Sequence, residues 1–324
     1  MSLDKNIRIV FMGTPKFAVA TLESLITNGF NVVGVVTTPD KPAGRGRKLQ
    51  KSAVKEFAES NCIPILQPDN LKDPEFLNSL KSFNGNVFII VAFRMLPEEV
   101  WKMPDMGTIN LHASLLPQYR GAAPINHAII NGETQTGVTT FFIDDKIDTG
   151  NILLKEEVDI YAYDNADDLH NILSETGAQL MIKTLLGIAD NSIKPKAQSL
   201  FITDVSKLKT APKIFPKDCI IDWNQEVTHI HNFIRGLSSS PGARSSLKNN
   251  EVTLSFKILE CFPEYAEHNL LPGTISTDGK HYLKIAGKDG FINIIDLQVE
   301  GRKKMNVTEF LNGFGISGYT INFN

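Results

Sequence analysis

Residues 7–37 read IRIVFMGTPKFAVATLESLITNGFNVVGVVT, two apolar segments on either side of a helical one. The apolar character of 7–11 and 31–37 predicts two buried strands. Between them, 15–28 has helical spacing, with Thr14 predicted as the N-cap and a proline at the first helical position. A strand, a helix and a strand in this order predict a parallel βαβ unit.

Strands continue to alternate with helices through the first 190 residues. Residues 87–93 form the longest apolar run, which is typical of a central strand in a sheet covered on both faces. Further strands are predicted at 63–66, 107–111 and 137–143, and helices at 54–60 and 167–188. This alternation predicts an α/β fold with a doubly wound, mostly parallel sheet.

The character of the sequence changes after Asp190. Residues 191–208 are rich in Lys, Ser and other polar residues with little periodicity, which predicts a linker. A predicted helix at 224–237 is followed by strand-like runs with Asp-Gly turns between them, at 252–260, 273–276, 281–286 and 291–299. We therefore expect a first domain at 1–190 and a second domain, a small β-barrel or sandwich, at 209–324.

The three cysteines, Cys62, Cys219 and Cys261, are far apart and form no C-x-x-C pair. This usage is typical of reduced thiols rather than of a disulfide framework or a zinc site. The longest apolar run is seven residues, whereas a membrane-spanning helix needs roughly 18. The N-terminus shows no signal-peptide pattern, so we expect a cytoplasmic protein that does not bind a membrane.

The net charge of −3, from 33 basic and 36 acidic side chains, is unevenly distributed. Residues 1–206 carry a net charge of −5, and 207–324 carry +2. Residues 40–55, here called the basic segment, contain six basic residues and one acidic residue among prolines and glycines. This segment is predicted to be a loop, either a solvated one or one that contacts the phosphate backbone of a nucleic acid.

The turn after the first strand reads GTPKFA from Gly13 to Ala18. A dinucleotide-binding unit would carry G-x-G-x-x-G at this position, with backbone amides facing the pyrophosphate. This turn has one glycine, and Pro15 removes an amide donor. The sequence therefore disfavours a nicotinamide-dependent oxidoreductase, which is the alternative that the fold suggests.

Residues 107–124, GTINLHASLLPQYRGAAP, hold the densest group of chemically active side chains. Asn110 and His112 are two residues apart at the end of a predicted strand and should project to the same side. This pair suits acyl-group chemistry, because Asn can hydrogen-bond a developing oxyanion and His can exchange a proton near neutral pH. The alternative is a capping Asn beside a surface His.

Asp148, in the turn after the next predicted strand, is a third candidate. A carboxylate near the imidazole of His112 would fix its orientation and pass protons through water. The Asp-Thr-Gly segment could instead be a turn that satisfies its own amides. One imidazole and one carboxylate make a poor site for zinc or iron, so we expect no metal. His229 and His231 are expected to be structural or solvent-exposed.

Several motifs together resemble the 10-formyltetrahydrofolate-dependent formyltransferases. The main one is N-x-H-x-S-L-L-P-x-Y-R-G-x-A-P, followed about 36 residues after the histidine by D-x-G. The G-T-P-x-F-A turn, the T-P-D-K-P-A-G-R-G stretch at 38–46 and the I-D-W segment at 221–223 extend the resemblance through nearly the whole chain.

Within this family the chain is most similar to the enzymes that act on tRNA. The resemblance implies transfer of a formyl group from the cosubstrate 10-formyltetrahydrofolate to the amino group of methionyl initiator tRNA, and we expect the chain to be a monomer. It implies a Rossmann-like formyltransferase fold followed by an OB-like barrel that contacts tRNA. By motif, Asn110 and His112 would stabilise the tetrahedral oxyanion, and Asp148 would orient His112 and relay the amine proton.

The resemblance also implies binding residues. The folate site would be formed by two strand-end segments and one aspartate, namely Ser114, Leu115, Leu116, Pro117, Phe93, Met95, Leu96 and Asp144. The tRNA acceptor would meet basic side chains of the basic segment, namely Lys41, Arg45, Arg47 and Lys48.

Two segments depart from the pattern of the tRNA enzymes. Residues 92–97, AFRMLP, are one residue shorter than the usual A-Y-G-x-I-L-P and are closer to the branch that acts on glycinamide ribonucleotide. Residues 238–243 lack the Trp that commonly precedes P-G-A. A formyltransferase for glycinamide ribonucleotide or a sugar nucleotide stays an alternative, against which the basic segment and the second domain argue. A tRNA-binding module without activity is a further alternative, disfavoured by the intact candidate residues.

Overall fold

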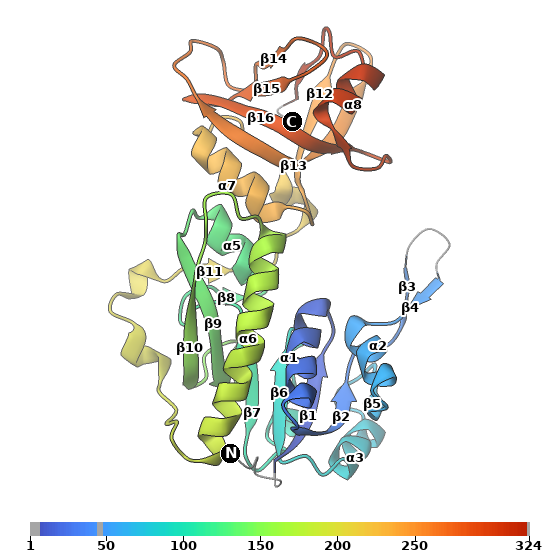
Figure 1. The fold of residues 1–324 in the computed structure, drawn as a ribbon, viewed down its shortest axis with the longest axis vertical. Helices are drawn as coiled ribbons and strands as arrows, with labels where there is room; N and C mark the ends of the chain where they lie inside the picture. Colours follow the sequence, from blue (N-terminus) through green and yellow to red (C-terminus); the bar gives the residue numbers. More distant parts are fainter. Residues whose placement is uncertain (1–6, 44–47, 323–324) are drawn as a thin grey trace. The chain divides into compact units, whose positions relative to one another are not determined.

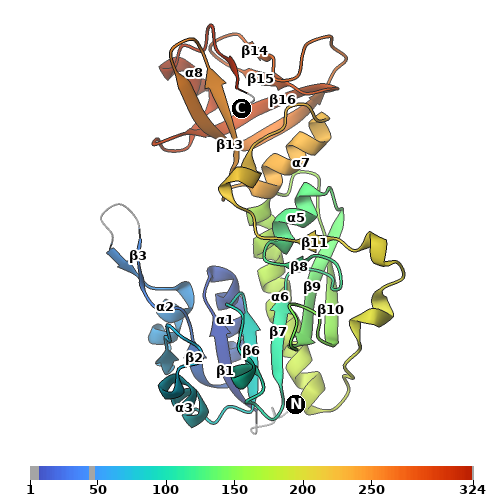
Figure 2. The same cartoon turned by 180° about the vertical axis from the view of Figure 1, so that it is seen from behind.

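The computed structural model describes residues 7–43 and 48–322, which form two compact units. Unit 1 comprises the described residues up to Gly121 together with Thr136–Asp159 and His170–Thr210. Unit 2 comprises Ala122–Gln135, Ile160–Leu169 and the described residues from Ala211 onward. Figures 1 and 2 show the chain from opposite sides. The segment predicted as a linker groups with unit 1 in this division, and the domain limits at 190 and 208 stay a prediction.

Unit 1 is built on a seven-stranded sheet in the order β10-β9-β7-β6-β1-β2-β5. Its strands are β1 (Arg8–Gly13), β2 (Asn31–Val36), β5 (Ile65–Leu66), β6 (Val87–Val91), β7 (Thr108–His112), β9 (Gln135–Phe142) and β10 (Ile152–Asp159). The strands from β5 to β7 in this order pair parallel, and β9 pairs antiparallel with β7. The doubly wound, mostly parallel sheet is therefore confirmed.

Helices cover both faces of this sheet. They are α1 (Lys16–Thr27), α2 (Ala53–Ser60), α3 (Pro74–Ser82), α4 (Glu98–Trp101) and α6 (Ala166–Ala189). Val10 and Met12 of β1 pack in one buried cluster with apolar side chains of α3 and α4. On the other face, the ring centroids of Phe17 in α1 and His170 in α6 are 5.2 Å apart, and both helices lie over the sheet in Figure 1. Coverage of both faces explains why β6 is apolar along its whole length.

The start of α1 differs from the prediction. Pro15, with φ −80° and ψ 174°, is extended and occupies the N-cap position without a side-chain cap. The side-chain oxygen of Thr14 is buried without a hydrogen-bond partner among the described residues. Thr14 is therefore not the N-cap, because the helix begins one residue later than predicted.

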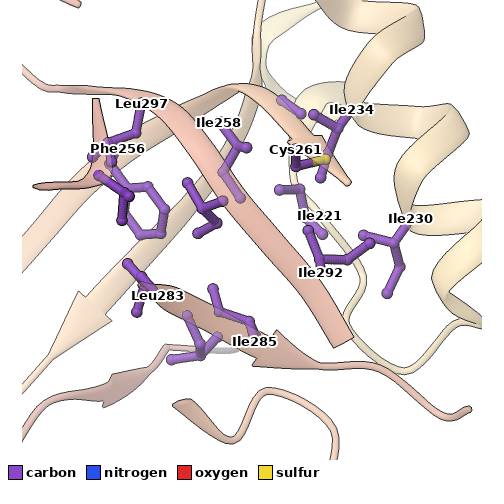
Figure 3. Close-up of a cluster of buried hydrophobic side chains, with 14 of the residues drawn as sticks. Ile221, Ile230, Ile234, Phe256, Ile258, Cys261, Leu283, Ile285, Ile292 and Leu297 are labelled. Carbon is purple, nitrogen blue, oxygen red and sulfur yellow. The ribbon is translucent and has the colours of Figure 1, made fainter. Parts of the chain in front are cut away.

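Unit 2 contains an antiparallel, barrel-like sheet in the order β14-β15-β16-β13-β12-β18, with β17 paired to β16. Its strands are β12 (Ala243–Lys248), β13 (Thr253–Tyr265), β14 (Ile275–Thr277), β15 (Leu283–Ala286), β16 (Gly290–Val299), β17 (Met305–Asn306) and β18 (Thr320–Ile321). Figure 3 shows side chains of β13, β15, β16 and a helix gathered in one core, among them Phe256, Ile258, Leu297 and Ile234. The small β-barrel predicted for the second half of the chain is confirmed.

The remaining elements are short or connect these sheets. They are α5 (Pro124–Ile130), α7 (Val227–Leu237), α8 (Val307–Gly313), the single-turn helices η1 (Gln198–Phe201), η2 (Val205–Lys207) and η3 (Pro216–Cys219), the paired strands β8 (Arg120–Gly121) and β11 (Thr210–Ala211), and the hairpin strands β3 (Lys41–Ala43) and β4 (Lys48–Gln50). Within the described part of the chain, none of the helices combines the length and hydropathy that a bilayer crossing requires.

Candidate active site

The carboxyl end of β7 carries Asn110 and His112. Asn110 lies in register with Ile90 of β6 and Phe141 of β9, and His112 lies in register with Thr139 of β9. Residues two apart in a strand share a face, so both side chains project to the same side of the sheet. Asn110 is partly exposed, and His112 is 7% exposed. The structure therefore presents an amide and an imidazole side by side at a strand end.

The imidazole of His112 is held in a defined orientation. Its Nε2 lies 2.9 Å from the carbonyl oxygen of Tyr119. Because a carbonyl can only accept, Nε2 carries a hydrogen, and Nδ1 holds the lone pair of the neutral ring. Nδ1 faces Oδ2 of Asp148 at 3.8 Å, which is longer than a hydrogen bond but within the range of an ion pair with a protonated ring. Nδ1 is therefore the ring atom available for proton transfer.

The carboxylate of Asp148 is also held in place. Its Oδ2 accepts a hydrogen bond of 2.9 Å from the backbone amide of Gly121. Asp148 has a φ of +55°, a left-handed conformation that Asp and Asn adopt more readily than most residues. Gly150 follows in the same turn, where a Cβ would lie 1.7 Å from the carbonyl oxygen of Phe142. The backbone geometry of this turn thus depends on both residues.

The two aspartates Asp144 and Asp148 make different contacts, one within the turn and one outside it. Asp144 bonds within the turn, because its Oδ1 accepts hydrogen bonds from the amide of Lys146 at 3.1 Å and from Oγ1 of Thr149 at 2.7 Å. Asp148 instead reaches out of the turn to His112 and Gly121. The turn-forming alternative therefore describes Asp144 better than it describes Asp148.

The segment after His112 folds back over the strand end. Oγ1 of Thr139 donates to the carbonyl of Ser114 at 2.6 Å and accepts from the amide of Leu116 at 3.1 Å. Oγ of Ser114 donates to the carbonyl of Gln118 at 2.6 Å. Leu116 is fully buried with Phe141. Of the predicted folate residues in this segment, Ser114, Leu116 and Pro117 have buried side chains, and Leu115 is partly exposed.

The second predicted folate segment follows β6. Leu96 is 8% exposed and belongs to the buried cluster of unit 1, against which Phe93 also packs. Met95 is 77% exposed. Arg94 donates hydrogen bonds to the carbonyls of Pro68 and Asp69 and so fastens this segment to the chain that follows β5. The side chains of this segment therefore differ widely in their access to solvent.

Two polar residues that we did not predict lie against the Asp148 turn. Nε and Nη2 of Arg120 donate to Oε1 of Gln198, at 3.1 and 2.6 Å. Nε2 of Gln198 donates to the carbonyls of Asp148 and Gly150, both at 2.9 Å. Arg120 belongs to the Y-R-G motif and could have been found from it, whereas nothing in the composition of residues 191–208 marks Gln198.

The described part of the basic segment is a hairpin rather than an open loop. β3 and β4 pair antiparallel, and Lys41 is exposed. Arg45 and Arg47 lie outside the described residues. At the base of the hairpin, Asp40 bonds to Nζ of Lys55 at 2.7 Å and to Nε2 of Gln67 at 2.8 Å, and these bonds lower the pKa of Asp40. The single acid of the basic segment is therefore neutralised internally.

No group of three or more His, Cys, Asp or Glu residues with a metal-binding arrangement occurs among residues 7–43 and 48–322.

Comparison with known proteins covers both units. Residues 5–185 match the family model for formyl transferase, and residues 213–315 match that for the formyl transferase C-terminal domain. The chain is 49% identical over 320 residues to the methionyl-tRNA formyltransferase of Bacteroides thetaiotaomicron, covering 98% of this chain and 99% of that protein. It is 51% identical over 313 residues to the methionyl-tRNA formyltransferase of Flavobacterium johnsoniae, covering 97% and 98% of the two chains.

Two solved structures share the fold. WlaRD, a sugar 3N-formyl transferase solved with dTDP and 5-N-formyl-THF, matches with a TM-score of 0.63 and 25% identity over 92% of this chain and 99% of that one. HypX from Aquifex aeolicus, in complex with tetrahydrofolic acid, matches with a TM-score of 0.63 and 18% identity over 94% of this chain and 47% of that one.

Proposed function

The chain belongs to the methionyl-tRNA formyltransferase family, and from this premise we propose that it formylates methionyl initiator tRNA. The donor is 10-formyltetrahydrofolate, and the product is formylmethionyl-tRNA for translation initiation. The observation that carries the proposal is identity near 50% over almost the whole length of relatives with that name. The solved sugar formyltransferase shares only 25% identity, which favours the tRNA substrate over a sugar nucleotide.

The reaction moves one carbon between two nitrogen atoms. The amino nitrogen of the methionyl ester attacks the formyl carbon, and the electron pair of the carbonyl bond moves to oxygen. The resulting tetrahedral intermediate carries an oxyanion and an ammonium group. Its collapse breaks the bond to N10 of the folate, and the proton lost by the amine balances the proton gained by the leaving nitrogen. The enzyme must therefore stabilise an oxyanion and move one proton.

We assign the oxyanion to Asn110 and His112. The side-chain amide of Asn110 is a donor near the end of β7, and His112 becomes a second donor through Nδ1 when its ring is protonated. Since Nε2 already donates to Tyr119, the ring cannot turn without losing that bond. A donor that is held in place before the reaction, as the His112 ring is, needs no reorganisation as charge develops.

We propose that Asp148 relays the amine proton. Its carboxylate lies 3.8 Å from Nδ1 of His112, and this position beside Nδ1 suits a relay of the amine proton. Tyr119 on one side of the ring and Asp148 on the other thus define which nitrogen reacts. The folate contacts of Ser114–Pro117, Phe93, Met95, Leu96 and Asp144 form part of the same proposal.

The basic segment is proposed as a contact for the tRNA backbone. Two of its six basic residues form internal ion pairs, Lys55 with Asp40 and Lys51 with Glu59, each at 2.7 Å. The other four are the proposed contacts, Lys41, Arg45, Arg47 and Lys48. A segment with four basic residues that are not used in these ion pairs suits a polyanion, because each neutralised phosphate releases counterions.

The direct test is turnover. Purified protein, incubated with methionyl initiator tRNA and 10-formyltetrahydrofolate, is expected to produce formylmethionyl-tRNA. Glycinamide ribonucleotide and an amino-sugar nucleotide, offered as competing acceptors, should be formylated about 100-fold more slowly, because they lack the oriented binding that the tRNA supplies. Absence of formylmethionyl-tRNA from folded protein, or faster formylation of either small acceptor, would overturn the proposal.

The hairpin assignment has its own test. Replacing Arg45 and Arg47 together by Ala should weaken tRNA binding and reduce the slope of log K against log salt by between 1 and 2, at roughly 0.7–0.9 per lost phosphate contact. Lys51→Ala is the matched control, because Lys51 is paired with Glu59. An unchanged slope in the double variant would show that Arg45 and Arg47 do not contact the tRNA backbone.

A further inference from the structure

We propose that Gln198 is a positioning residue for formyl transfer, which sets the Asp148 carboxylate beside His112. The inference rests on the function proposed above and adds to it a residue outside the recognised motifs. Gln198 lies at the start of η1, in the segment that the sequence predicts as a linker. It is 4% exposed, so its amide interacts with protein groups rather than with bulk water.

The contacts of Gln198 fix the orientation of its amide. Its Oε1 receives two guanidinium hydrogens from Arg120, and its Nε2 gives hydrogens to the carbonyls of Asp148 and Gly150. Rotating the amide by 180° would place its NH₂ group against the guanidinium and its oxygen against two carbonyls. The four hydrogen bonds therefore allow one orientation.

These contacts complete a closed ring of residues. Arg120 reaches Gln198 through its side chain, and its neighbour Gly121 reaches the Asp148 carboxylate through its backbone amide. Gln198 then bonds the backbone of Asp148 itself. Gln198, which is held by Arg120, thus bonds to the backbone of Asp148, and Gly121 bonds to its carboxylate.

Asp148 needs such support because of its conformation. A non-glycine residue at a φ of +55° is in a sparsely populated region, and such residues persist where surrounding contacts over-determine them. If the two amide hydrogens of Gln198 were lost, the carbonyls on either side of Thr149 would lose their donors. The turn could then relax, and the 3.8 Å approach of Oδ2 to Nδ1 of His112 would no longer be fixed.

Gln198→Glu separates the two halves of this arrangement. The introduced carboxylate still accepts from Arg120, and beside that guanidinium it stays ionised, but it cannot donate to Asp148 or Gly150. We expect kcat for formylation to fall about 10- to 100-fold, as for a small displacement of a catalytic group. KM for tRNA and for the folate should change less than about 3-fold, because the substrate contacts are elsewhere.

Gln118→Ala is the matched control. Gln118 also joins the site segment to the end of the predicted linker, through the carbonyl of Lys207 at 3.2 Å, and to the next residue but one, through the amide of Lys209 at 2.8 Å. Within the described part of the chain its side chain bonds to Lys207 and Lys209 and not to the Asp148 turn, so its removal should leave kcat within about 3-fold of the wild type. If Gln198 merely anchors the linker, Gln118→Ala and Gln198→Glu should have similar effects, which would overturn the proposal.

A double-mutant cycle tests whether Gln198 acts through Asp148. With Asp148 already replaced by Asn, Gln198→Glu should lower kcat by less than about 3-fold, because the positioned charge is gone. Full additivity of the two losses would show that Gln198 acts independently of Asp148 and would overturn the proposal.

Hydrogen exchange gives a readout that does not depend on turnover. In Gln198→Glu, peptides covering Asp148–Gly150 and the Gly121 amide should exchange at least 10-fold faster than in the wild type, and in Gln118→Ala they should not. Absent wild-type turnover with this exchange pattern would overturn the proposed function while leaving the positioning of Asp148 supported. Unchanged exchange in Gln198→Glu would overturn the role of Gln198 whatever the activity.

Discussion

His112 in unit 1 and His231 in unit 2 are equally buried, each with 7% of its surface exposed, but they lie in opposite electrostatic surroundings. His112 stands between a carbonyl oxygen and a carboxylate. His231 stands on α7 near the guanidinium of Arg235, with its ring centroid 6.1 Å from that of Tyr163. Burial first, and then the positive charge of Arg235, lower the pKa of His231 to about 4.

Burial alone does not distinguish the histidine that we propose as catalytic, because the two rings are equally buried and differ in the charge beside them. Arg235 is itself buried, where it donates to the carbonyl of Asp164 and to Oδ1 of Asn232. A proton on His231 would add a second positive charge to this desolvated cluster, which the protein opposes. A proton on His112 would meet the Asp148 carboxylate. The charge beside each ring therefore distinguishes His112, for which we propose proton exchange, from His231, whose pKa is lowered.

The same substitution at both sites gives the sharpest contrast in activity. His112→Gln keeps a donor for the Tyr119 carbonyl but removes Nδ1, and we expect kcat to fall about 10³-fold. Binding of tRNA should stay within about 3-fold of the wild type. His231→Gln, assayed at pH 7.5, should retain wild-type kcat. Comparable kcat values for the two variants would contradict this contrast, because the charge beside each histidine would then have no effect on activity.

Asp148→Asn tests the carboxylate that distinguishes the His112 site. Asn also tolerates the left-handed conformation and can still accept from the Gly121 amide, so the substitution removes mainly the charge. We expect kcat to fall about 10²-fold, with KM values changed by less than about 3-fold. Asp145→Asn is the matched control, because Asp145 is an exposed acid in the same turn. Equal activity of the two variants would remove the carboxylate from the mechanism.

The sequence predicts the parts of the fold whose patterns are local. The apolar runs at β1, β2 and β6 and the long periodic pattern of α6 locate unit 1, and the Asp-Gly turns locate the strands of unit 2. β10 was missed because it lies at the sheet edge and reads ILLKEEVD, which is apolar only at its start. α3 was missed because nine residues are too few for a clear helical period.

The candidate site can likewise be predicted only where the sequence pattern is local. Asn110 and His112 can be found from their spacing in a strand, since neighbours two apart share a face. The contribution of Gln198 cannot, because its partners are 50 and 78 residues away along the chain. The partner of His112 Nε2 is likewise a backbone carbonyl, that of Tyr119. Since every residue has such a carbonyl, the residue type at this position does not predict the contact. What the sequence leaves out is therefore the set of contacts made between distant segments.

The smallest effect that we predict concerns stability around His231. Because its pKa is lowered from 6.5 to about 4, between these pH values the unfolded chain binds a proton that the folded chain does not. The free energy of unfolding should therefore fall as the pH falls, by about 2 kcal/mol between pH 7.5 and pH 5 from this residue.

Denaturant unfolding at both pH values measures this contribution. His231→Gln should lose about 2 kcal/mol less than the wild type between pH 7.5 and pH 5, whatever its stability at pH 7.5, because Gln does not titrate. His229→Gln is the matched control for replacing a histidine of this helix, since His229 lies two residues away on α7 with an exposed side chain. If His231→Gln and the wild type lose equal stability, the folded protein accepts a proton at His231 as readily as the unfolded chain does. The proposed effect of burial and Arg235 on His231 would then be wrong. The role proposed for His112 would still depend only on the kinetics of the His112 variant.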